Sequence, residues 1–248
     1  MTTPADPIPD SSVTAPKSSR SRAGLVAALI LPIGPVAIAV LRFLLPYSTV
    51  DGPGAMAAKV ANHLGAQYLV VWLGLVAALT IVPAVIWIGR VTRPSAPVLT
   101  GIALILAVPG YLAMAVILST DIVLWSGIRS GLDPAVVSQV VASAHPAVGV
   151  AEGIFVIGHL FGTLLLGMAL WRSKAVPRWA AGMTVISQPL HLVAAVFLVN
   201  PSMDLVAWLM TAVGFGAAGY AIDKVKGREG FVLGRPSGMD FASLSSRA

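Results

Sequence analysis

The stretch that decides the fold is Ala147-Val-Gly-Val-Ala-Glu-Gly-Ile-Phe-Val-Ile-Gly-His-Leu-Phe-Gly-Thr-Leu-Leu-Leu-Gly-Met-Ala-Leu-Trp171. It is apolar apart from Glu152, His159 and Thr163, and it is long enough to cross a roughly 30 Å hydrocarbon core as a helix. Backbone groups in lipid must be satisfied within each segment, so such a run predicts a transmembrane helix. Similar apolar runs cover residues 23–45, 67–88, 98–120, 179–199 and 205–222. Together with 147–171 they predict an all-α, polytopic six-helix transmembrane bundle.

The composition of the whole chain agrees with this fold class. The 248 residues are 57% hydrophobic and 10% charged, with a mean hydropathy of +0.88, which excludes a water-soluble globular protein. The net charge of +6 does not indicate nucleic acid, because the basic residues lie in short segments between apolar runs; the predicted partner is the lipid bilayer. The absence of cysteine excludes disulfides, thiolate metal sites and iron–sulfur clusters.

The distribution of Lys and Arg predicts the orientation. Counted over six spans, 13 basic residues fall on the side of the two termini and 3 on the other side. Positive charge marks cytoplasmic loops, so we expect a multi-pass protein of the cell membrane with both termini in the cytoplasm, its first span acting as an uncleaved signal anchor. The three basic residues on the opposite side are Arg42, Lys59 and Arg129.

The segments outside the spans divide into tails and external loops. Residues 1–22 and the basic segment 224–248 are rich in Ser, Pro and Gly, which predicts disordered cytoplasmic tails. Both longer loops, 46–66 and 121–146, are external. Asp133 before Pro134 is a helix-start pair followed by an apolar face, so a short interfacial helix is expected there, and 55–64 shows a weaker version. Prolines within the spans, such as Pro32 and Pro189, predict bends.

Two spans carry polar stripes. At 100° per residue, Glu152, His159 and Thr163 share one face of the fourth span. Small-residue pairs flank this stripe, Gly149 with Gly153 on one side and Gly158 with Gly162 on the other, and predict close neighbours on both sides. The fifth span carries a second stripe: Thr184, Ser187, Gln188 and His191.

The short turn between these spans predicts an antiparallel pair whose facing residues have numbers summing to about 349. His159 then faces Gln188, and Thr163 faces Thr184, while His159 and His191 lie about one turn apart in depth. The ligand or proton-relay candidates are therefore Glu152, His159, Gln188 and His191. Arg42, at the end of the first span, is expected to extend to the headgroups.

Three interpretations of the polar stripes remain open. They are hydrogen-bonded contacts between two helices, or the wall of a cavity that holds a small ligand, an ion or a proton relay, or a haem site with two histidine ligands, for which the hairpin leaves little room. No metal site is predicted: the external residues His63, His145, Asp51, Asp121, Asp133 and Asp204 lack metal-ligand spacing and are expected to be solvated.

One turn resembles a known family. The hairpin 158–179 contains Arg172-Ser-Lys-Ala-Val-Pro-Arg178, and it is similar to the bacterial multi-pass membrane proteins grouped as domain of unknown function 4386, common in actinobacteria, in which a span ends in an Arg-Ser-x-x-x-Pro-Arg turn. The order of spans and loops over about 23–223 fits as well. The resemblance implies a six-helix membrane domain of uncharacterised activity and supplies no catalytic residues.

No catalytic motif occurs in a suitable context. The sequence therefore favours a non-enzymatic membrane component, a sensor or an accessory protein, that is free to form a homo-oligomer or to bind another membrane protein. The alternatives are a small-solute or proton-coupled transporter and a haem-containing electron carrier.

Overall fold

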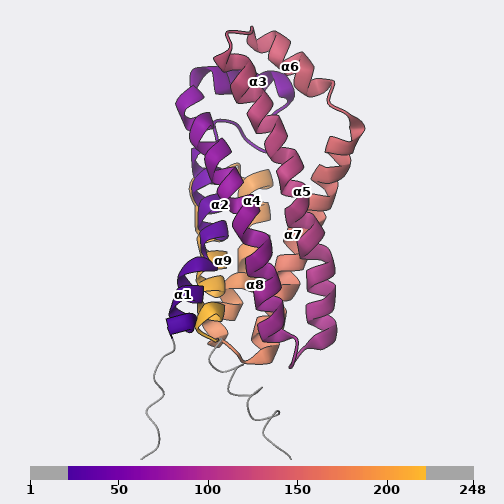
Figure 1. Ribbon diagram of the computed structural model, residues 1–248. Helices are drawn as coiled ribbons and strands as arrows, with labels where there is room; N and C mark the ends of the chain where they lie inside the picture. Colours follow the sequence, from indigo (N-terminus) through magenta and orange to yellow (C-terminus); the bar gives the residue numbers. More distant parts are fainter. Residues whose placement is uncertain (1–21, 222–248) are drawn as a thin grey trace, which may run out of the picture.

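The computed structural model describes residues 22–221, and these residues form helices and turns without any strand. The predicted tails lie outside this part, except that α1 begins at Arg22. Six of its segments are long and apolar enough to cross a membrane, so the all-α polytopic bundle is confirmed (Figure 1). The elements are α1 (Arg22–Ile30), α2 (Ile33–Leu44), α3 (Pro53–Asn62), α4 (Leu64–Thr92), α5 (Pro97–Arg129), α6 (Pro134–Ala142), α7 (Pro146–Ser173), α8 (Arg178–Leu192), η1 (Val193–Phe197) and α9 (Pro201–Tyr220).

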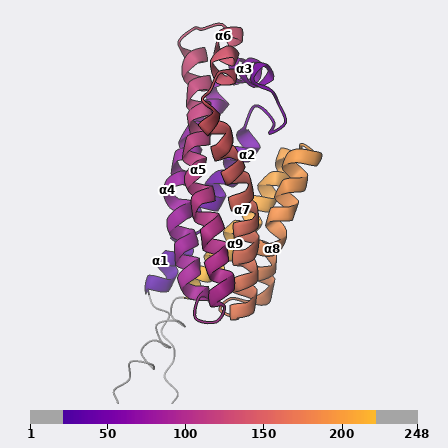
Figure 2. The same ribbon diagram turned by 90° about the vertical axis from the view of Figure 1, so that its right-hand side faces the viewer.

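The two ends of the bundle differ. α3 and α6 lie across the ends of α4, α5 and α7, and we name this the α3/α6 end (Figures 1 and 2). α1 begins and α9 ends at the opposite, terminal end. The helices α4, α5 and α7 have 29, 33 and 28 residues, whereas α9 has 20. At 1.5 Å per residue the longer helices extend beyond α9, and Figure 2 shows this difference at the α3/α6 end.

Proline and side-chain caps fix where the helices begin. Proline occupies the first position of α3, α5, α6, α7 and α9, where its missing N–H costs nothing and its φ is already helical. The carboxylate of Asp133 accepts a hydrogen bond from the backbone N–H of Ala135. The predicted short helix after Asp133 is confirmed as α6, and the weaker pattern at 55–64 is confirmed as α3.

Two spans differ in detail from the prediction. The first span, Gly24–Leu44, is interrupted at Leu31 and Pro32, which divide it into α1 and α2, as expected of a bend at Pro32. The third span continues to Arg129, so Asp121 lies inside α5 rather than in an external loop. The apolar run ends at residue 120, but helical hydrogen bonding does not need apolar side chains once the helix leaves the membrane.

The predicted helix contacts of α7 are half confirmed. A Cβ on Gly158 would lie 2.6 Å from Gly110 Cα, and one on Gly162 would lie 2.7 Å from Ala107 Cα, so only glycine allows α5 and α7 to approach this closely. The other pair, Gly149 and Gly153, has open space at the position of an added Cβ. That flank of α7 therefore has no close neighbour near the α3/α6 end, whereas farther along it a Cβ on Gly167 would lie 2.9 Å from the backbone N of Val185 in α8.

A large apolar core lies toward the terminal end. Large side chains from α4, α7 and α9 are fully buried there, with 0% exposure: Ile81, Ile88, Leu166, Leu170 and Phe215. The buried carboxyl groups, Asp121 and Asp204, lie instead in the half of the bundle nearer to α3 and α6.

Candidate functional site

The turn from α8 to α9 brings two polar residues together. After Pro189, which cannot donate a backbone hydrogen bond, α8 continues as the π-helical segment η1. Val199 follows with a φ of +48°, a left-handed conformation that is strained for a β-branched residue. Asn200 then caps α9 by accepting hydrogen bonds from the N–H groups of Ser202 and Met203. This compact turn places Asp204, in the first turn of α9, beside His191 near the end of α8.

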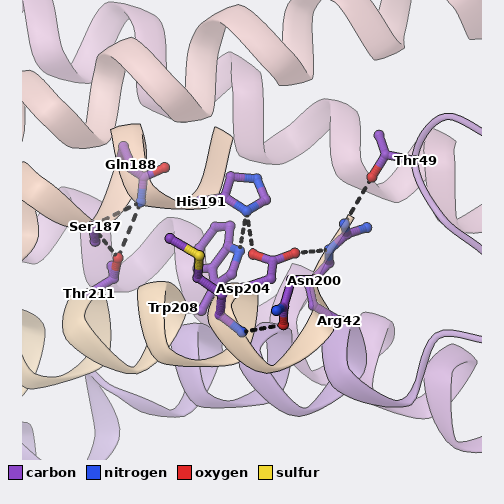
Figure 3. A network of polar contacts seen from close by, with 10 residues as sticks. Arg42, Thr49, Ser187, Gln188, His191, Asn200, Asp204, Trp208 and Thr211 are labelled. Carbon is purple, nitrogen blue, oxygen red and sulfur yellow. Dashed lines mark hydrogen bonds and ion pairs between the residues drawn. The ribbon is translucent and has the colours of Figure 1, made fainter. Parts of the chain in front are cut away.

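Asp204 is the centre of a buried charged group (Figure 3). Its Oδ2 accepts a hydrogen bond from Arg42 Nε at 2.7 Å, and its Oδ1 lies 2.5 Å from His191 Nδ1. The Asp204 side chain is only 2% exposed and that of Arg42 is 19% exposed. Arg42 also donates to the hydroxyl of Thr49. The expectations that Arg42 extends to the headgroups and that Asp204 is a solvated loop residue are therefore wrong, because the two residues neutralise each other inside the protein.

The imidazole of His191 has two competing partners on one nitrogen. Nδ1 lies 2.5 Å from Asp204 Oδ1 and 3.1 Å from Trp208 Nε1. An indole N–H only donates, so Trp208 bonds Nδ1 when that atom carries no proton. When Nδ1 carries the proton, it donates to Asp204 instead. Trp208 and Asp204 therefore compete for the same nitrogen of His191.

His159 contacts this group from α7. Its ring centroid is 5.4 Å from that of His191 and 6.0 Å from that of Trp208, and its Nδ1 lies 2.6 Å from the carbonyl oxygen of Phe155. Its Nε2 is buried without a hydrogen-bond partner in the described part of the chain. The predicted one-turn offset between His159 and His191 is wrong. In the predicted register, residues whose numbers sum to about 349 face each other, and the numbers of these two histidines sum to 350.

Gln188 points to α9 rather than to His159. Its Nε2 donates to the hydroxyls of Thr211 and Ser187, each at 3.2 Å, and the hydroxyl of Thr211 donates to that of Ser187 at 2.8 Å (Figure 3). Thr163 likewise bonds Tyr111 at 2.7 Å, not Thr184. The two predicted pairings across α7 and α8 are therefore wrong, because Gln188 turns to α9 and Thr163 turns to α5.

Glu152 is separate from the three other candidates. It is exposed, makes no hydrogen bond or ion pair with any described residue, and lines a cavity of about 660 Å³ at the α3/α6 end. Arg42 and Phe155 also line this cavity, so its floor adjoins the Asp204 group and His159. Several residues at its rim are exposed: Thr49, Ala144, His145 and Gly149. The cavity is open and lies among α2, α4, α5, α7 and the α3/α6 segments, not between α7 and α8.

A second buried carboxyl group forms part of the cavity wall. Asp121 Oδ1 accepts hydrogen bonds from the Tyr47 hydroxyl at 2.5 Å and from Gln67 Nε2 at 2.7 Å. Burial raises the pKa of Tyr47 well above its usual value, and the nearby Asp121 carboxyl group raises it further. Tyr47 therefore remains a neutral donor that holds Asp121 in place. The expectation that Asp121 is solvated is wrong.

The structure does not fit a haem held by the two histidines. Ligation from both faces of a porphyrin requires the macrocycle to lie between the imidazoles, whereas the rings of His159 and His191 contact each other edge to face, at 61°. The external histidines have other roles: His145 caps α7 by accepting from the N–H of Ala147, and His63 bonds the carbonyl of Lys59. Among residues 22–221, no group of three or more His, Cys, Asp or Glu could hold a metal ion.

Sequence reasoning missed Asp204, Asp121, Tyr47 and Trp208. Asp204 had one available signal: it lies three residues after Pro201 and therefore in the first turn of a helix, where its side chain can face the preceding helix. Asp121 had none, because it directly follows the apolar run of the third span, where a loop is the ordinary expectation. Comparisons of the chain with protein-family models, curated proteins and solved structures return no match.

Proposed function

We propose that this protein is a non-enzymatic component of the cell membrane, a sensor or an accessory protein, that receives a small molecule in the cavity at its α3/α6 end. The observation that supports this proposal is the cavity of about 660 Å³, which is in the size range of ligand sites. Its walls are mostly apolar, and its polar lining includes Arg42, Tyr47, Asp121 and Glu152. This is the usual chemistry of a small-molecule site.

We propose that the α3/α6 end faces outward. The basic residues of the turns at the terminal end are Arg90, Arg93, Arg172, Lys174 and Arg178, and only Arg42, Lys59 and Arg129 lie toward the other end among the described residues. Positive charge favours the cytoplasmic side. In this orientation the ligand enters from outside.

We also propose that the chain belongs to the family of domain of unknown function 4386. The support for this proposal is the Arg172–Arg178 turn.

One observation favours a proton-coupled transporter as the second candidate. Two residues of the cavity wall, Arg42 and Phe155, contact Asp204 and His159. Asp204, His159 and the neighbouring His191 are groups able to carry a proton. A solute would still have to pass the dense apolar half of the bundle, for example between Ile88 and Leu170, each 0% exposed. Movement of a solute or of protons in reconstituted vesicles would distinguish the transporter from the receptor.

The experiment for the receptor uses single cysteines, which the cysteine-free chain makes unambiguous. Gly149→Cys lies on the cavity wall and Gly153→Cys lies one turn deeper outside it, and an added Cβ meets nothing within 4 Å at either position. We expect a neutral, membrane-impermeant maleimide added outside intact cells to label Gly149→Cys quickly and Gly153→Cys slowly. Ser187→Cys should stay unlabelled, because Ser187 is 0% exposed.

Occupancy is tested with the same variant. A neutral alcohol, 1-octanol, should slow the labelling of Gly149→Cys in a saturable way, and Met114→Trp, which places a large side chain in the cavity, should weaken that protection. Equal labelling of Gly149→Cys and Gly153→Cys, or labelling of Gly149→Cys only after the cells are opened, would contradict the proposal.

A further inference from the structure

We infer that the molecule held in this cavity is an organic cation with an apolar body. The inference rests on the proposed function and adds the chemical class of the ligand. It depends on the charges that remain on the cavity wall after every ion pair has been taken into account.

Two of the charged groups at the cavity are already neutralised. Arg42 is paired with Asp204 at 2.7 Å, and Asp51 is paired with Lys59 at 2.6 Å. The hydrogen bond from Lys59 also lowers the pKa of the Asp51 carboxyl group. Neither pair leaves a full charge for a ligand.

Asp121 and Glu152 have no cationic partner. No described Lys or Arg forms an ion pair with either carboxyl group, and both line the cavity. The unpaired charge of the cavity is therefore negative.

Asp121 is held so that one oxygen is free. Tyr47 and Gln67 both donate to Oδ1, whereas no described residue donates to Oδ2. Asp121 as a whole is only 8% exposed, yet it is part of the cavity wall. Two neutral donors fix this carboxyl group through one oxygen and leave the other without a donor among the described residues, which is the arrangement expected of an acceptor that is oriented in advance.

The remaining walls decide what kind of cation fits. A small metal ion needs several oxygen ligands at short range, and the described residues contain no such cluster. The cavity instead offers wide apolar contact, which suits a weakly hydrated charge carried by a hydrophobic body. The apolar side chains are Ile38, Leu41, Leu45, Met56, Met114, Ile117, Leu118, Phe155 and Val156.

The test compares two ions of the same shape and opposite charge, tetraphenylphosphonium and tetraphenylborate, in the Gly149→Cys protection assay on the full chain in nanodiscs. We expect saturable protection by the cation at a concentration at least tenfold below that needed for the anion. Glu152→Gln should reduce the ratio of the protecting anion concentration to the protecting cation concentration about tenfold. The double variant Asp121→Asn with Glu152→Gln should abolish the preference for the cation. Asp133→Asn is the matched control, because it removes one carboxylate at the exposed cap of α6 and leaves the ratio unchanged.

The outcomes separate the two proposals. Equal protection by both ions, or a charge preference that survives in the double variant, overturns the cation inference while the octanol result still supports a receptor. Protection by neither ion, with octanol still protecting, also overturns the inference alone. Absence of protection by octanol and by both ions overturns the proposed function together with the inference. A preference for the cation that falls in Glu152→Gln and persists in Asp133→Asn supports it.

Discussion

Removing one partner of the Arg42–Asp204 pair should cost far more stability than removing both. In Asp204→Val, the guanidinium of Arg42 loses a contact of 2.7 Å and stays largely buried, at 19% exposure. Breaking a buried pair typically costs about 3–5 kcal/mol. Arg42 borders an open cavity and keeps its bond to Thr49, so we expect about 2–4 kcal/mol. The double variant Arg42→Met with Asp204→Val should be within about 1 kcal/mol of the natural protein, since neither the guanidinium nor the carboxylate remains and His191 Nδ1 keeps the indole N–H of Trp208 as its donor.

The measurement is unfolding in mixed micelles by increasing the fraction of dodecyl sulfate, followed by circular dichroism at fixed protein concentration. The matched control is the pair with the more exposed cation: Lys59 is 45% exposed and Asp51 is 16% exposed. In Lys59→Met, Asp51 keeps the hydrogen bond from the backbone N–H of Ser48, so the effect should not exceed about 1 kcal/mol. An Asp204→Val variant as stable as Lys59→Met, or a double variant as unstable as Asp204→Val, would refute this reasoning.

Three further predictions follow from the backbone and from one surface pair. Gly158→Ala should destabilise the protein by about 2 kcal/mol or more in the same unfolding assay, because its Cβ would meet backbone at 2.6 Å, whereas Gly153→Ala should be neutral or slightly stabilising. Val199→Gly should stabilise it by about 0.5–1 kcal/mol, since glycine adopts the +48° φ without strain. The hydrogen bond from Lys59 lowers the pKa of Asp51, so this pair should contribute its full stabilisation of the folded protein above the ordinary Asp pKa. That stabilisation should be lost as the pH falls through the lower pKa of the folded protein. Acid unfolding curves of Asp51→Asn should lack this dependence on pH.

The number of helices was predictable because lipid demands long apolar segments, and each of the six spans leaves that mark. The side-chain partners were less predictable. A stripe such as that of Gln188 shows which face of a helix is polar, but not which neighbour covers it, and α9 covers that face in place of α7. The cavity was not predictable at the level of residues, because α2, α4, α5 and α7 enclose it from distant parts of the chain.

Errors at single residues had two physical causes. Asp204 and Asp121 look like loop residues because each borders the end of an apolar run, yet both sit within helices and are satisfied by partners far away in sequence, Arg42 and Tyr47. The contact of His159 with His191 follows from the predicted register and was missed when Gln188 was assigned as the partner.

The close approach of α5 and α7 has a mechanical consequence. Gly110 and Gly158 bring two backbones into contact with no side chain between them, and Met114 and Phe155, about one turn away on the side of α3 and α6, line the cavity. Backbone atoms in contact cannot rearrange as rotamers do, and the contact of Gly162 with Ala107 repeats this approach one turn farther on, so α5 and α7 are held at a fixed separation along this stretch. From Gly110, α5 continues for about 28 Å to Arg129 at 1.5 Å per residue. Any change in the width of the cavity therefore has to come from this part of the helix and not from the crossing.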